Sequence, residues 1–170
     1  MNFVRPLDTG ATFPSSNNVG VVMLALEARA VLEGPDLSVE FDRYDPDRGE
    51  VDGSCFRLDS FYARIPNAAG AGKIYFAFAV PPGHYAFVWW RTGSTGGRLS
   101  DFPVTGYFHA PDDRIAYIGD LVAVEDDGMV IEYDVDAARA ALDAFPNVTA
   151  DPVITKLIPA DNPGHILCTI

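Results

Sequence analysis

The sequence has few basic residues. Its 170 residues include 12 Lys and Arg against 24 Asp and Glu, which gives a formal net charge of −12 at pH 7. No segment gathers the basic residues into a patch. Because such a charge repels nucleic acids and anionic membrane surfaces, we expect neither as a partner.

Long apolar runs are also missing from the sequence. The longest uncharged apolar run near the N-terminus, from Gly20 to Leu26, is far shorter than the ~20 residues that cross a bilayer. It also lacks the charge pattern and cleavage site of a signal peptide. We therefore expect no transmembrane segment and a cytoplasmic location. The alternative is the periplasm or cell envelope, if an export signal has been removed.

Cysteine and histidine are scarce. The cysteines Cys55 and Cys168 fit either one disulfide or two buried thiols, and the sequence does not decide between them. The histidines His84, His109 and His165 are far apart and show no zinc-ligand spacing. We therefore expect no histidine metal centre and no cofactor. A zinc site or a Cys–His nucleophilic pair would need these side chains to converge in space.

The sequence does contain two apolar runs around a Pro-Pro-Gly turn, between Lys73 and Trp90. Bulky side chains occupy even positions before the turn and odd positions after it. A hairpin centred on Pro82 and Gly83 would place them on one face, because side chains alternate along a strand. This pattern predicts the core hairpin of a β-sandwich. The bulky residues are Ile74, Phe76, Phe78, Val80, Tyr85, Phe87 and Trp89.

The rest of the chain predicts one domain. With 48% hydrophobic residues, a chain of this length can bury a full core. Residues 1–19 predict an irregular lead-in, and residues 20–170 predict a mainly β, antiparallel sandwich of about eight strands. Clean alternation over residues 37–43 predicts a strand with one face in water. Asp127-Gly128 predicts a hairpin that pairs Val124 with Ile131.

A helix is predicted near residues 135–145. Its apolar side chains recur at helical spacing, and Asp134 or Asp136 can cap its N-terminus. Pro146 ends it. A second short helix is predicted from Asp151-Pro152, because an acidic cap followed by Pro is a common helix start.

Two segments offer candidate sites. In the acidic loop 42–52, Asp45, Asp47 and Gly49 have a spacing similar to that of calcium loops, and Asp52 is a further candidate acid. The loop lacks the bidentate Glu of an EF-hand and contains arginines, so a solvated hairpin is the favoured interpretation and these acids are weak metal candidates.

Aromatic residues supply the other candidate site. On the second face of the predicted hairpin, Tyr75 lies opposite Trp90, with Arg91 beside them. Exposed aromatic side chains on a sandwich face can stack on sugars or peptides, so these three residues are the candidate ligand-binding residues. The alternative is that the predicted helix covers this face.

Three motifs together resemble a family of small bacterial β-sandwich proteins of uncharacterised function. They are the Pro-Pro-Gly-His-Tyr turn of residues 81–85, the Ile-Ala-Tyr-Ile-Gly-Asp strand of residues 115–120 and the acid-capped helix that ends at Phe145-Pro146. The resemblance covers residues 70–147 and implies a prealbumin-like sandwich. Its members are often exported or lipid-anchored, and it implies no catalytic residues.

These observations lead to a functional expectation. We expect a non-enzymatic binding or interaction module, associated with the bacterial cell envelope, whose ligand is an unknown protein or glycan. One alternative is a metal-dependent or hydrolytic enzyme that uses the acidic loop or convergent histidines. A purely structural accessory protein is another.

Overall fold

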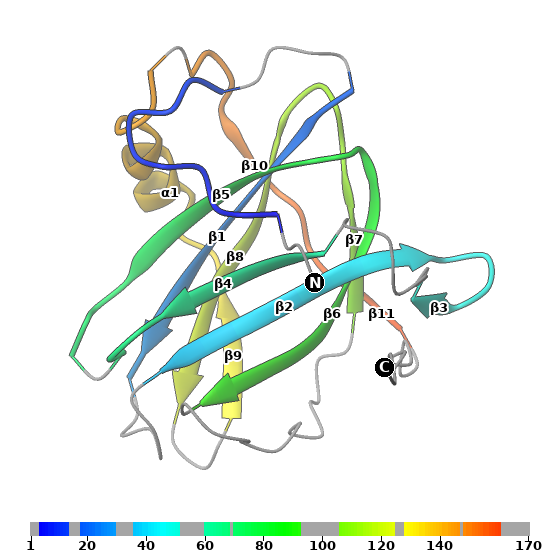
Figure 1. Ribbon diagram of the computed structural model, residues 1–170, viewed down its shortest axis with the longest axis horizontal. Coiled ribbons are helices and arrows are strands. Elements are labelled where there is room, and N and C mark those ends of the chain that lie inside the picture. The colour runs from blue at the N-terminus through cyan, green and yellow to red at the C-terminus, as the bar shows by residue number, and fades with distance from the viewer. Residues whose placement is uncertain are drawn as a thin grey trace.

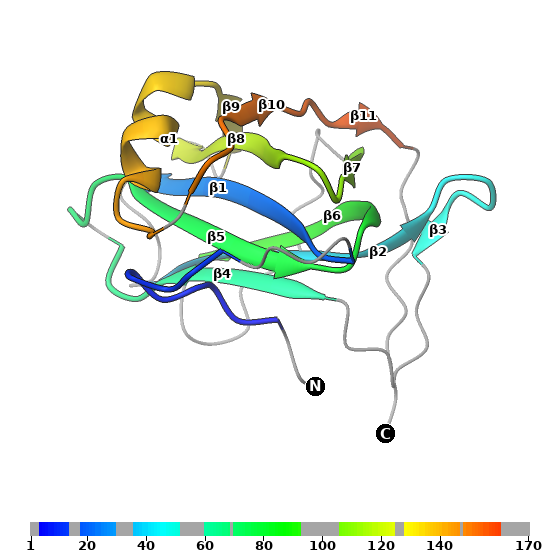
Figure 2. The same cartoon turned by 90° about the horizontal axis from the view of Figure 1, so that it is seen from above.

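The computed structural model shows a mainly β protein with two sheets, and one helix within the stretches it describes. Figure 1 shows the elements face on, and Figure 2 shows that the two sheets form two layers. The side chains of Trp89, Arg91 and Thr92 are not described. The described stretches are residues 4–13, 18–29, 36–51, 60–68, 70–92, 106–124, 128–146 and 148–160.

One layer is a five-stranded sheet. β8 runs parallel to β1 and β10 and antiparallel to β9, so the prediction of a wholly antiparallel architecture is wrong. Between β1 and β8 the chain also forms strands of the other sheet. These two strands are therefore not joined by a hairpin, which would make them antiparallel. The order is β10 (Pro152–Ile154), β8 (Ile115–Val124), β1 (Gly20–Ala28) and β5 (Ile74–Val80), with β9 (Gly128–Glu132) also on β8.

The other layer is a six-stranded sheet. Its strands pair antiparallel throughout the described residues. The β2–β3 hairpin projects beyond the body of the sheet, as Figure 2 shows. The order is β11 (Ile158–Pro159), β7 (Gly106–Ala110), β6 (Gly83–Thr92), β2 (Leu37–Asp45) and β3 (Glu50–Val51), with β4 (Phe61–Ile65) also on β2.

The main core lies between the layers and is rich in phenylalanine. The rings of Phe41 and Phe61 stack with centroids 4.8 Å apart, and Phe61 lies equally close to Phe78 of the opposite sheet. Phe108 on β7 is also fully buried in this core. Burial of these large side chains is the main force that holds the sheets together.

The predicted hairpin around the Pro-Pro-Gly turn is wrong in its pairing. β5 pairs with β1 in one sheet, whereas β6 pairs with β2 and β7 in the other. Phe78 and Phe87 still both face the core, but they reach it from opposite layers. Alternation identified the buried face correctly for Phe78, Val80, Tyr85 and Phe87, because it is the same whether two strands share a sheet or face each other across a core. The prediction is wrong for Ile74, which is exposed at the start of β5.

A β-bulge at Val88 changes the phase of β6. Phe41 lies opposite Phe87, but Glu40 lies opposite Trp89, so Val88 has no partner residue on β2. After the bulge, Trp90 points into the core and is 3% exposed. The prediction that Trp90 lies on the outer face is therefore wrong.

The alternation of β2 is confirmed on one face. Leu37, Val39 and Phe41 are fully buried in the core, as predicted. On the other face, Ser38 and Glu40 are only 2% and 4% exposed, so the prediction of a face open to water is wrong at these two positions.

A second bulge, at Gly119, sets the geometry of β8. Met23 lies opposite Tyr117 and Ala25 lies opposite Asp120, so β8 carries one extra residue. The β8–β9 hairpin forms as predicted, but Val124 pairs with Gly128 rather than with Ile131.

The helix α1 (Val135–Leu142) covers part of the outer face of the five-stranded sheet. The carboxylate of Asp134 accepts a hydrogen bond from the backbone N–H of Ala137 at 3.0 Å, which confirms the predicted cap. Phe145 packs edge-on against Phe13, with ring centroids 5.1 Å apart. Figure 1 shows the helix beside this N-terminal segment.

The second predicted helix is wrong. Residues 152–154 form β10, which pairs with the part of the β8 edge that β9 does not reach. An unpaired edge offers backbone hydrogen bonds to any extended neighbour, and this context overrides the local start signal. Within the described residues, no helix is long and apolar enough to cross a membrane. Cys55 and Cys168 lie outside the described stretches.

Candidate functional site

Two histidines that are distant in sequence meet at one end of the six-stranded sheet. His84 is the second residue of β6 and lies directly opposite His109 on β7. The next pair, Tyr85 and Phe108, is buried in the core, so the histidines point to the outer face. The centroids of the imidazole rings are 5.0 Å apart, with an angle of 62° between their planes.

Two tyrosines extend this row of rings. Tyr107 lies edge-on to His84 with ring centroids 5.8 Å apart, and Tyr44 lies 4.8 Å from Tyr107. Ala86 pairs with Tyr107 on the adjacent strand, and its small side chain leaves room for the larger rings. His109 is exposed, His84 and Tyr107 are half-buried, and Tyr44 is buried. We call Tyr44, His84, Tyr107 and His109 the aromatic strip.

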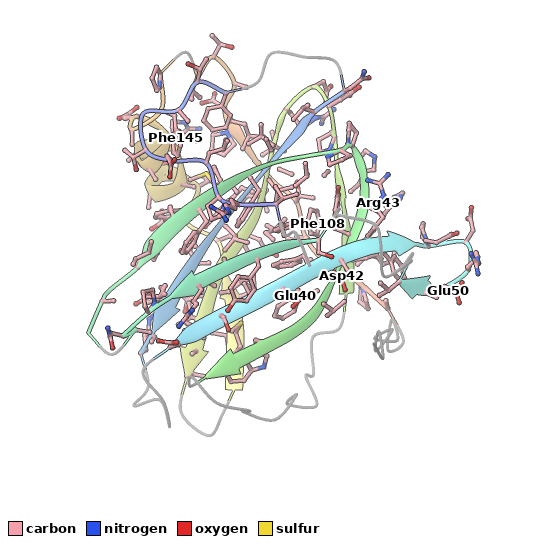
Figure 3. The ribbon with its side chains drawn as sticks, in the orientation of Figure 1. Glu40, Asp42, Arg43, Glu50, Phe108 and Phe145 are labelled. Carbon is pink, nitrogen blue, oxygen red and sulfur yellow. The ribbon has the colours of Figure 1, made fainter. Side chains whose placement is uncertain are left out.

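The Pro-Pro-Gly turn holds the start of β6 in place. The hydroxyl of Tyr85 donates a hydrogen bond to the carbonyl of Pro81 at 2.8 Å, and the guanidinium of Arg43 donates to the same carbonyl at 3.2 Å. Gly83 has φ +144°, and a Cβ atom there would lie 2.3 Å from Arg43. Figure 3 shows Arg43 at this turn. The motif is thus a structural clamp that fixes the backbone next to His84.

The acidic loop adjoins the aromatic strip and forms the predicted solvated hairpin. One carboxylate oxygen of Asp45 accepts hydrogen bonds from the N–H groups of Asp47 and Arg48, at 3.0 and 3.1 Å. Arg48 also pairs with Glu50, which Figure 3 shows on the projecting hairpin. Asp52 lies outside the described residues. The turn is therefore stabilised by its own side chains.

The electrostatics of the strip favour a neutral imidazole at His84. Partial burial lowers the pKa of His84, and His109 and Arg43 lower it further. The carboxylates of Asp47 and Asp45 act in the opposite direction. The neutral ring is both a hydrogen-bond donor and an acceptor, so it can bind uncharged polar groups.

Among the described residues, no group of three or more His, Cys, Asp and Glu side chains is placed to hold a metal ion. Sequence reasoning did not join the histidines, because residues 85–108 separate them and the Gly-rich stretch 93–97 between their strands does not specify a pairing register. The alternation along β7 was informative. Tyr107 and His109 alternate with the apolar residues Phe108 and Ala110, which indicates that Tyr107 and His109 point away from the core.

Comparisons with known proteins add little. No family model matches the chain, and no curated protein matches it. Among solved structures, a leucine-rich repeat protein from Bacteroides thetaiotaomicron VPI-5482 is similar at 16% sequence identity and a TM-score of 0.33. The similar region covers 74% of this chain and spans 16% of that protein. A likeness at this score carries no argument about fold or function.

The ligand-binding residues predicted from sequence do not form one surface. Tyr75 lies on β5 in the five-stranded sheet, whereas Trp90 lies in the core beneath the six-stranded sheet. The backbone of Arg91 pairs with Ser38, and its side chain is not described. The premise that Tyr75 and Trp90 oppose each other is wrong, because β5 and β6 belong to different sheets.

Tyr75 instead borders a polar cluster on the outer face of the five-stranded sheet. The carboxylate of Asp120 is fully buried and accepts hydrogen bonds from the ammonium of Lys73, at 2.5 Å, and from the hydroxyl of Tyr117. The same hydroxyl accepts the N–H of Asp134 at the helix start, at 3.2 Å. This cluster ties β5, β8 and α1 together, and we interpret it as structural.

Proposed function

We propose that the protein is a non-enzymatic binding module that holds a neutral glycan on the aromatic strip. The observation that carries this proposal is the row of ring contacts across β2, β6 and β7. Aromatic rings with polar tips offer a sugar ring an apolar stacking surface and hydrogen-bonding groups together. The strip lies on the outer face of the sheet, opposite the core between the layers.

The charge around the strip supports a neutral ligand. The carboxylates of Asp45 and Asp47 act to raise the pKa of His84, and His109 acts to lower the pKa of Asp113 in the adjoining turn. Acidic side chains therefore lie near both histidines of the strip. With a net charge of −12, the whole chain repels anionic ligands. Carboxylates accept hydrogen bonds from sugar hydroxyls, so the acids at the rim suit an uncharged glycan.

The finer architecture and the location belong to the same proposal. The two packed layers are consistent with a prealbumin-like or Ig-like sandwich. The clamp at residues 81–85 offers a structural explanation for the Pro-Pro-Gly-His-Tyr motif on which the family resemblance rests. Membership in that family and association with the cell envelope remain predictions.

Affinity electrophoresis through gels that contain neutral polysaccharides tests the proposal. With EDTA present to remove metal ions, we expect at least one neutral polysaccharide to retard the protein, and calorimetry with the matching hexasaccharide to show binding. Tyr107→Ala should lower the affinity at least tenfold, about 1.4 kcal/mol, because it removes the central ring. His109→Ala removes an exposed ring and should weaken binding with little effect on folding.

Tyr62→Ala is the matched control, since Tyr62 lies on the outer face of the same sheet at β4 and should leave the affinity unchanged. Equal losses in both tyrosine variants, or retardation by acidic polysaccharides alone, would contradict the proposal. If peptides bind to the strip and glycans do not, the ligand is a protein rather than a glycan. Substrate turnover that His84→Ala abolishes would favour the enzyme alternative.

A further inference from the structure

We propose that His84 and His109 form a two-imidazole site for a divalent transition-metal ion, with Cu²⁺ and Zn²⁺ as the preferred ions. This inference goes beyond the proposed function and does not depend on it, because it concerns the metal ion alone. It rests on the placement of the rings, the rigidity of their strands and the ligand chemistry of imidazole.

The spacing of the rings fits a shared metal ion. Histidine nitrogens bind Zn²⁺ at about 2.0–2.1 Å, so two ligands at a tetrahedral angle place their ring centroids about 5 Å apart. The observed separation of the centroids is 5.0 Å. The two residues are direct partners on neighbouring antiparallel strands, so rotation of the side chains can direct a nitrogen of each ring towards one point without movement of the backbone.

The backbone on both sides of the pair is held by its surroundings. Gly83 pairs with Ala110 on one side of the histidines, and the buried pair of Tyr85 and Phe108 lies on the other. The hydrogen bond from the Tyr85 hydroxyl to Pro81 fixes the turn before β6. Because the strands are already ordered, a metal ion would pay little conformational entropy to bring the two ligands together.

The ligand set selects the class of metal ion. Imidazole suits Zn²⁺, Cu²⁺ and Ni²⁺, whereas Ca²⁺ and Mg²⁺ require several oxygen ligands. Water would complete the coordination, since no third His, Cys, Asp or Glu ligand joins the pair within the described stretches. With two protein ligands, affinity should follow the Irving–Williams order, with Cu²⁺ bound most tightly.

Calorimetric titration of the full chain with Cu²⁺ and Zn²⁺, without any glycan, tests this site. We expect one ion per chain with Cu²⁺ bound more tightly, and the electron paramagnetic resonance spectrum of bound Cu²⁺ should show coupling to two imidazole nitrogens. His84→Ala and His109→Ala should each lower the affinity for Cu²⁺ at least tenfold. Ca²⁺ and Mg²⁺ at the same concentrations should not bind.

Two controls keep the result interpretable. His165→Ala removes the third histidine and should leave Cu²⁺ binding unchanged, while circular dichroism checks that each variant folds. Because His109 is exposed, His109→Gln provides a second variant with little risk of misfolding. The inference is overturned if both single-histidine variants retain the native affinity, or if the spectrum shows no nitrogen ligands. Failure to bind glycans would leave this result untouched, because no glycan is present.

Discussion

At the scale of single residues, Gly119 decides which side chains of β8 face the core. Ile118 and Leu121 both enter the core, and Tyr117 and Asp120 both lie on the outer face, although strict alternation would separate the members of each pair. The extra residue at Gly119, with φ +110°, produces this change of phase. The bulge thereby brings the Tyr117 hydroxyl to the buried carboxylate of Asp120.

Gly119→Ala should destabilise the protein by about 3 kcal/mol, because backbone strain and a steric clash act together. A Cβ atom at this position would lie 2.6 Å from the Ile131 side chain and 2.9 Å from the Glu132 carbonyl. Gly10→Ala is the matched control, since Gly10 has φ +90° with nothing within 4 Å of the added Cβ, and should cost only about 1 kcal/mol. Urea unfolding measures both; equal losses would mean that the space around Gly119 is unimportant.

The polar cluster around Asp120 predicts a loss of stability in alkali. Burial and the Asp120 carboxylate raise the pKa of Tyr75 and Tyr117, and the hydrogen bond to Asp120 raises the pKa of Lys73. Groups with a raised pKa keep protons in the folded state that the unfolded chain releases above about pH 10. Their contribution is therefore complete below that pH and is lost as the pH rises through the folded-state values.

Tyr75→Phe tests this account. The hydroxyl of Tyr75 is buried and has no hydrogen-bond partner among the described residues, so its removal should not lower stability at pH 8. It should also make the free energy of unfolding fall less steeply between about pH 9 and 10.5, because one group with a raised pKa is gone. Urea unfolding at a series of pH values gives both results. An unchanged slope, or a loss above about 1 kcal/mol at pH 8, would show that the hydroxyl has a stabilising partner.

At the scale of elements, the helix was predictable because its signals are local. The cap at Asp134 and the apolar spacing lie within a short stretch, and α1 begins where they indicate. It ends at Leu142, before the end that Pro146 predicts. Arg139 on the helix binds Asp136 at 3.0 Å and Asp151 at 2.9 Å. Asp151 comes within reach only because β10 returns along β8, which no local pattern indicates.

The cap gives an element-scale prediction. Asp134→Ala removes the acceptor for the Ala137 N–H and should cost about 1 kcal/mol, whereas Asp134→Asn keeps an acceptor and should cost much less. Urea unfolding at pH 7 separates the two. If Asn costs as much as Ala, the charge of Asp134 near Lys73, rather than the cap, stabilises this end of the helix.

At the scale of the whole molecule, the sequence predicted a single mainly β fold and most buried positions, but not which strands are neighbours. Alternation places Phe78 and Phe87 in the core equally well across a hairpin or across two layers, so the sheet membership of β5 and β6 could not follow from it. The aromatic strip could not be predicted either, because it depends on which strands are neighbours. Its residues come from β2, β6 and β7, whose adjacency is decided by the packing of the whole core.

The glycan site on the aromatic strip is the central claim, and nuclear magnetic resonance of the aromatic side chains tests it most directly. In a titration with the hexasaccharide of the retarding polysaccharide, with EDTA present, ring signals of His84, Tyr107 and His109 should shift together and saturate with one affinity. The rings of Tyr62 and Tyr75 should not respond, since they lie elsewhere on the sheets. Shifts that centre on Tyr75, or saturable binding that leaves the strip unchanged, would contradict the claim.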